Sequence, residues 1–187
     1  MPLIRETIVT TVDRAGAVHI APLGIIEEDG HWIVAPFPPS QTLDNLRAVP
    51  HAVASHVDDV RVFAGCLTDR RDWPVVATEG PVPRLQAAHA HWELAVENVT
   101  EHAERPRFKS RLVRAVCHAP ASGFNRAQAA VIELAILASR LDFLPRDKVA
   151  REVAYLAIAV KKTAGPREEE AWGWLMEKLR AFYGGDP

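Results

Sequence analysis

The chain has 187 residues, of which 25% are charged, and its formal net charge is −2. This balance offers no basic surface for nucleic acids or anionic membranes, and no apolar run approaches the roughly 20 residues of a membrane helix. The two cysteines, Cys66 and Cys117, do not form a disulfide framework, and the first residues lack a signal-peptide pattern, so we expect a cytoplasmic protein.

The first part of the chain is predicted to form short β-strands. Segments rich in Ile, Val and Thr alternate with turn residues. The predicted strands are 4–12, 17–27, 31–37, 51–57 and 75–82. A short helix is expected near 41–48, and residues 60–67 fit either a strand or a loop. Short strands at this spacing predict a small barrel or sandwich.

Residues 91–101 tolerate a helix, but their side-chain pattern favours a strand. Trp92, Leu94 and Val96 would lie on one side of that strand, with Glu93 and Glu97 on the other. Residues 107–118 would pair back across the turn as a hairpin.

From Ser122 the composition changes to Ala and Leu with helical periodicity. Helices are predicted at 123–140, 146–162 and 167–183, with Pro145 and Pro166 near helix starts. The fold class is therefore α+β, with an all-β domain over 1–120 and a three-helix domain over 121–187.

Four segments carry a resemblance to a known family. They are IVTTVDRAGAVHIAPLGI, PFPPSQTLDNL, VDDVRVFA and FNRAQAAVIELAILASRL, in this order along most of the chain. Together they resemble the prokaryotic family called "domain of unknown function 447", which is similar in fold to the FMN-binding split barrels. Those include pyridoxamine-phosphate oxidases and flavin reductases.

The resemblance implies an antiparallel split β-barrel over 1–120, a C-terminal three-helix domain, and FMN as cofactor. It also implies a homodimer with FMN at the subunit interface and a small-molecule electron donor or acceptor. The chain departs from the family pattern at Leu43 and Ser55, where relatives often have an aromatic residue and an asparagine. An aromatic contact to the flavin would then be missing.

The helix start after the prolines is a candidate phosphate seat. Ser40, Thr42 and Asn45 offer hydroxyls and an amide where a helix dipole favours an anion. The alternative is structural, with Ser40 as a plain N-cap and Asn45 facing solvent. The balancing positive charge would come from Arg47, Arg61, Arg84 or Arg126.

Other residues could contact the flavin ring or its polar rim. Pro22, Leu23 and Gly24 end a predicted strand, where a flat ring could lie against backbone groups. Phe37 could cover the ring, and Asp59 could bind a ribityl hydroxyl. The alternatives are an ordinary edge strand, a core aromatic residue and a turn.

One charged stripe interrupts the apolar helix 123–140. Arg126, Glu133 and Arg140 are spaced by seven, so they share one face. They fit a ladder within the helical part or across a dimer interface, or Arg126 could point into a ligand pocket.

A metal site is not predicted. His89 and His91 could supply two ligands on one side of a strand, but no third or fourth ligand has suitable spacing.

The predicted function is an FMN-binding flavoprotein that acts as an oxidoreductase or flavin reductase on an unidentified small molecule, with no catalytic residue assigned. A non-catalytic flavin or ligand sensor and a flavin-free helical interaction module are the alternatives. Reduction of bound flavin separates the first two, and a colourless protein would indicate the third.

Overall fold

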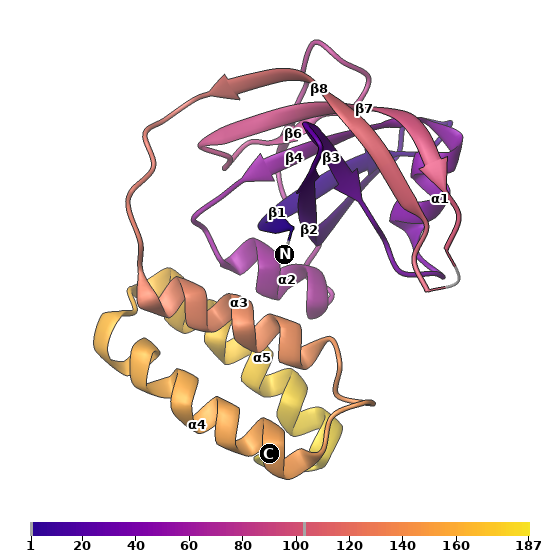
Figure 1. The fold of residues 1–187 in the computed structure, drawn as a ribbon. Helices are drawn as coiled ribbons and strands as arrows, with labels where there is room; N and C mark the ends of the chain where they lie inside the picture. The colour runs from indigo at the N-terminus through magenta and orange to yellow at the C-terminus, as the bar shows by residue number, and fades with distance from the viewer. Residues whose placement is uncertain (1, 103) are drawn as a thin grey trace. The chain divides into compact units, whose positions relative to one another are not determined.

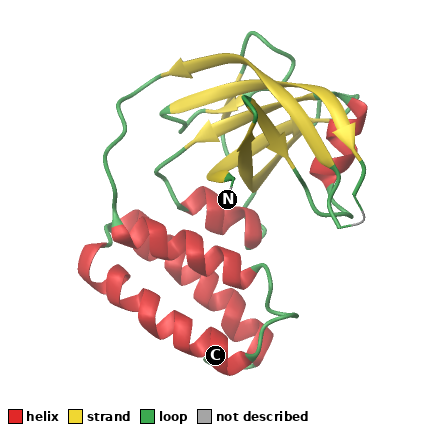
Figure 2. Ribbon diagram, in the orientation of Figure 1, coloured by secondary structure: helices red, strands yellow, loops and turns green. Residues whose placement is uncertain are grey.

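The structure is a computed structural model that describes residues 2–102 and 104–187. The chain divides into two compact units. We call Met1–Val57 with Trp73–Ala121 the barrel unit, and Asp58–Asp72 with Ser122–Pro187 the helical unit. Figure 1 labels their elements, and Figure 2 shows the strands together with a helix in the first unit and helices in the second.

The barrel unit is built on a closed antiparallel barrel with the strand order β1-β2-β3-β8-β7-β4. The strands are β1 (Leu3–Val12), β2 (Val18–Glu28), β3 (His31–Val34), β4 (His51–His56), β7 (Ala90–Thr100) and β8 (Arg107–Cys117). The predicted strands 4–12, 17–27 and 51–57 and the 91–101/107–118 hairpin are confirmed, and the strand predicted over 31–37 is confirmed as far as Val34. The α+β fold class, a barrel followed by helices, is confirmed as well.

Local chemistry explains the first hairpin. The Asp13 carboxylate accepts hydrogen bonds from the backbone N–H groups of Ala15 (2.8 Å) and Ala17 (2.9 Å), which closes the turn between β1 and β2. Gly16 adopts a φ of 85°, which a residue without Cβ tolerates. The turn thereby fixes the β1–β2 register, which pairs Val12 with Val18.

The barrel interior is filled by alternate residues of each strand and by α1 (Gln41–Ala48). Leu43 and Leu46 of α1 pack into this core. The strands contribute Val9, Ile25, Trp32, Val34, Ala52, Ala54, Leu94 and Phe108, with Trp92 and Val96 packed against them. The predicted apolar side of β7 is thus confirmed.

Residues 73–89, which precede β7, contain as regular structure among the described residues only the two-residue strands β5 (Val75–Val76) and β6 (Arg84–Leu85). The prediction of a strand over 75–82 is therefore wrong beyond its first residues, because Pro81 and Pro83 lack the N–H groups of a ladder. Instead, Val82 packs against Val12 and Val53, so the segment covers the outer face of β1 and β4.

The helical unit contains α2 (Arg61–Leu67), α3 (Arg126–Ala138), α4 (Arg146–Thr163) and α5 (Pro166–Tyr183). The three predicted C-terminal helices are confirmed. The expectation of strand or loop for 60–67 is wrong, because Val60 and Ala64 pack into the core of the helices, against Leu134 and Leu175 among others. No helix among the described residues is long and apolar enough to span a membrane.

Candidate functional site

The predicted ring-binding residues lie in the middle of β2, opposite β1. Pro22, Leu23 and Gly24 pair with Ile8, Thr7 and Glu6. Among residues 2–102 and 104–187, β3 pairs with β2 only over Ile26–Glu28, so the stretch before Ile26 has a ladder partner on one side only. A proline is tolerated in such a half-paired stretch.

Part of the backbone of residues 22–24 is already hydrogen-bonded within the barrel unit. Thr7 donates a hydrogen bond from its hydroxyl to the Leu23 carbonyl at 2.9 Å. A Cβ on Gly24 would lie 2.7 Å from Cγ2 of Ile4, so β1 packing alone favours glycine there. The flavin-binding role of these residues stays a prediction.

The start of α1 combines a helix cap with a buried polar anchor. The Ser40 hydroxyl accepts a hydrogen bond from the Leu43 N–H at 3.4 Å. Asn45 is 1% exposed, donates to the Thr11 hydroxyl at 3.0 Å and accepts from Gln41 at 2.7 Å. The alternative that Asn45 faces solvent is therefore wrong, because its amide fastens α1 to β1.

Thr42 is also buried in α1, at 2% exposure, whereas Ser40 is half-buried. Leu43 and Ser55, the two departures from the family pattern, both serve the fold. Leu43 packs in the barrel core, and the Ser55 hydroxyl accepts a hydrogen bond from the Leu85 N–H at 3.2 Å.

Phe37 is 56% exposed and lies beneath an arginine that sequence reasoning missed. The guanidinium carbon of Arg105 is 4.6 Å from the centre of the Phe37 ring. Arg105 comes just before β8 and Phe37 just after β3, so the antiparallel pairing of Val34 with Phe108 brings the two segments together. Among the described residues, no carboxylate forms an ion pair with Arg105.

The four arginines considered as phosphate partners differ from Arg105 in their surroundings. Arg47 binds Glu101 with two hydrogen bonds of 3.1 Å. Arg84 donates to the carbonyls of Leu85 and Gln86. The other two, Arg61 and Arg126, belong to the helical unit.

Asp59 is a structural partner of Arg61. It is 6% exposed and accepts hydrogen bonds from Arg61 Nε (2.9 Å) and Nη2 (2.7 Å). Burial alone would raise the pKa of Asp59, but the hydrogen bonds and charge of Arg61 outweigh it and hold that pKa below its ordinary value. Arg126 is exposed and lines a groove together with Glu133. The predicted flavin contacts of Asp59 and Arg126 are untested.

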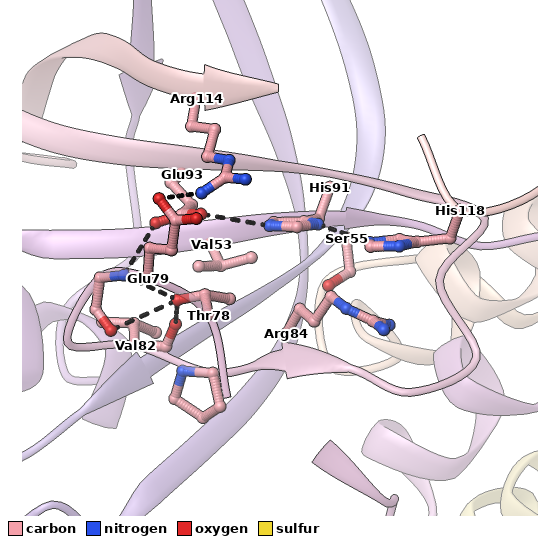
Figure 3. Close-up of polar contacts among 12 residues, drawn as sticks. Val53, Ser55, Thr78, Glu79, Val82, Arg84, His91, Glu93, Arg114 and His118 are labelled. Carbon is pink, nitrogen blue, oxygen red and sulfur yellow. Dashed lines mark hydrogen bonds and ion pairs between the residues drawn. The ribbon is translucent and has the colours of Figure 1, made fainter. Parts of the chain in front are cut away.

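A hydrogen-bonded row of side chains lies on β7 and at the end of β8 (Figure 3). Nδ1 of His91 is 2.8 Å from Nε2 of His118, and Nε2 of His91 is 3.4 Å from a Glu93 oxygen. The other Glu93 oxygen accepts from the Gly80 N–H at 3.0 Å. His91 and Glu93 are buried, whereas His118 is exposed.

This row has the arrangement of a proton relay. If Nε2 of His91 donates a hydrogen bond to Glu93, Nδ1 of His91 accepts a hydrogen bond from Nε2 of His118, which leaves Nδ1 of His118 as the free acceptor. Burial, Arg84 and His91 lower the pKa of His118, which favours its neutral form. Sequence reasoning placed Glu93 on the outer side of β7 but missed its burial, since a register shift after Glu93 and the cover by Gly80 are long-range features.

A second cluster surrounds Trp92. The Arg5 guanidinium lies 5.9 Å from the Trp32 ring and 5.8 Å from the Trp92 ring, and His56 meets Trp92 edge-on at 4.4 Å. Nε2 of His56 and Nδ1 of His89 are buried and have no hydrogen-bond partner in the described part of the chain. Among the described residues, no group of three or more His, Cys, Asp or Glu could hold a metal ion.

Comparisons with known proteins match nearly the whole chain. The family model described as "Protein of unknown function (DUF447) N-terminal domain" matches residues 5–119, and "Protein of unknown function (DUF447)" matches residues 125–177. No curated protein matches.

Solved structures share the fold. An FMN-bound protein of the same family model from Methanosarcina mazei is 21% identical, covers 94% of this chain and 95% of its own, and has a TM-score of 0.81. An FMN-binding protein from Thermus thermophilus is 20% identical over 63% of this chain and 72% of its own, with a TM-score of 0.52. The styrene monooxygenase flavin reductase of Pseudomonas putida S12 is 18% identical over 61% and 81%, with a TM-score of 0.50.

Proposed function

The chain belongs to the family described as protein of unknown function DUF447, and from this premise we propose that it is a cytoplasmic flavoprotein that binds FMN through its barrel unit. The fold it shares with FMN-binding proteins supports this proposal. The main observation for FMN binding is the positive charge of Arg105, which has no ion-pair partner among the described residues. This guanidinium lies over the exposed ring of Phe37, just before α1.

The residues at the α1 end of the barrel unit fit a phosphate group. A phosphate prefers a fixed cation, a hydroxyl and backbone N–H groups at a helix N-terminus. Arg105 supplies the cation, and half-buried Ser40 supplies the hydroxyl at the start of α1. Thr42 and Asn45 are buried in α1 and would hold the start of this helix in place, since Asn45 is hydrogen-bonded to Thr11 and Gln41.

The flat ring of the cofactor fits the half-paired stretch of β2. Backbone groups of Pro22, Leu23 and Gly24 have no strand on one side, and Phe37 offers an exposed aromatic face. Bound FMN would supply electron or hydride transfer, while the chain binds and orients it. We further propose a homodimer with the cofactor at the subunit interface, as the family resemblance implies.

The proposed reaction class is that of an oxidoreductase or flavin reductase with a small-molecule donor or acceptor. Mixing the FMN-loaded protein with NADH or NADPH tests this class, because fast bleaching of the flavin indicates turnover. A loaded protein that neither nicotinamide nor a deazaflavin reduces would instead favour the sensor alternative.

The phosphate seat is tested by comparing FMN with riboflavin in equilibrium titrations. We expect FMN to bind more tightly, because hydrogen bonds to a charged group contribute about 1.5–3 kcal/mol each. Arg105→Gln should weaken FMN binding about tenfold or more and leave riboflavin binding unchanged. Arg107→Gln is the matched control, since Arg107 is paired with Glu28 at 3.0 Å. Equal affinities for FMN and riboflavin would contradict the proposed phosphate site.

A further inference from the structure

The outer face of α3 carries charges that nothing in the helical unit neutralises. Arg126 and Glu133 are exposed and lie seven residues apart on α3, which places them on one stripe, whereas the exposed Arg140 lies beyond the end of α3 at Ala138. Among the described residues none of the three forms an ion pair or a side-chain hydrogen bond. The neighbouring helix α4 differs, since Asp147 is bound to Arg151 at 2.7 Å.

A groove runs beside this stripe, between α3 and α4. Its volume is about 260 Å³. It is lined by Arg126, Ala129, Ala130 and Glu133 of α3 and by Tyr155, Leu156, Ile158 and Ala159 of α4. Tyr155 is 75% exposed and Ile158 is 51% exposed. Large apolar side chains beside small alanines are typical of a surface that packs against another helix.

We propose that this surface binds the same surface of a second copy of the chain, with the two α3 helices antiparallel across a two-fold axis. The midpoint between Arg126 and Glu133 falls between Ala129 and Ala130. With the axis there, Arg126 of each copy faces Glu133 of the other, and the exposed Ala129 of each copy lies at the crossing. Two reciprocal ion pairs then form, and Tyr155 and Ile158 flank the contact.

The charge pattern selects a second copy over other occupants. A two-fold interface uses one patch twice, so it must be complementary to itself. A face with one positive and one negative charge at equal distances from a pair of alanines meets this condition. A small anion fits less well, since Glu133 lies in the same groove as Arg126.

Cross-linking tests this surface independently of any barrel–barrel contact. The parent protein carries Ala129→Cys and Cys117→Ser, because Cys117 is the exposed native thiol. With the axis beside residue 129, the two introduced thiols come within disulfide range, and mild oxidation should yield a covalent dimer at low protein concentration. Failure of the folded parent to cross-link would overturn the proposal.

Charge reversal supplies the specificity. Adding Arg126→Glu should slow cross-linking about tenfold or more, because two pairs of like charges then face each other. Adding Glu133→Arg to that variant should restore the parent rate. Arg140→Glu is the control. In the antiparallel arrangement Arg140 of one copy faces a residue that precedes α3 in the other copy, so this change should leave the cross-linking rate unaltered. Equal rates for Arg126→Glu and Arg140→Glu, or no rescue by the double reversal, would contradict the interface.

Discussion

His56 shows how a single buried side chain can limit stability in acid. Burial, with smaller effects of His89, Arg5 and His91, lowers the pKa of His56 to about 4. The ordinary value is 6.5, so the unfolded chain takes up this proton first as the pH falls. The structure therefore loses stability as the pH decreases from about 6.5 towards 4.

We predict that His56→Gln reduces this loss. The variant lacks the group that protonates preferentially in the unfolded state, so its urea midpoint should fall less between pH 7 and pH 5 than that of the native protein. His102→Gln is the control, because His102 is exposed in the β7–β8 turn. A midpoint whose pH dependence is unaltered by His56→Gln would show that His56 is not the acid-sensitive group.

His91 links a buried carboxylate to the surface, so its loss should be costly. His91→Leu removes a partner of Glu93 and leaves that carboxylate buried with the Gly80 N–H. Leaving a buried polar group unpaired costs about 1–3 kcal/mol. His118→Ala, at the exposed end of the same row, should cost less, because the space left by the imidazole lets water reach Nδ1 of His91. Equal free energies of unfolding for the two variants would contradict the importance of the buried part.

Residues fixed by local chemistry could be predicted, whereas residues brought together by pairing of strands far apart in the sequence could not. Ser40 caps α1 because its hydroxyl reaches an N–H three residues ahead, which sequence spacing shows. Arg105 meets Phe37 only through the pairing of β3 with β8. The contact of His91 with His118 could have been predicted, because the two residues lie at the open ends of the predicted 91–101/107–118 hairpin.

At the scale of single elements, α1 depends on one buried amide. We predict that Asn45→Ala lowers the free energy of unfolding by about 1–3 kcal/mol, because it leaves the Thr11 hydroxyl without its donor. Asp44→Ala is the matched control on the exposed side of the same turn, and a loss below about 1 kcal/mol is expected. Chemical denaturation measures both. A smaller effect for Asn45→Ala than for Asp44→Ala would mean that packing alone holds α1.

Most elements follow from periodicity, and the exceptions have physical causes. β7 was predictable from the alternation of Trp92, Leu94 and Val96. α2 was not, because Val62, Phe63, Ala64 and Cys66 are all buried and leave no alternation to separate helix from strand. Its helical state depends on packing against helices more than 60 residues later in the chain.

At the scale of the whole molecule, the order of barrel and helices was predictable from the change in composition at Ser122. The assignment of residues 58–72 to the helical unit was not, because this segment interrupts the barrel sequence between β4 and β5. Composition alone predicts that the chain passes from one unit to the other once, near Ser122. In the structure it passes between the two units three times, after Val57, Asp72 and Ala121.

The visible absorption spectrum of the purified protein, recorded after incubation with FMN and removal of the excess, tests flavin binding most directly. We predict that the flavin bands stay with the folded protein. A protein that circular dichroism shows to be folded, but that remains colourless after this treatment, would contradict the account and indicate a flavin-free interaction module.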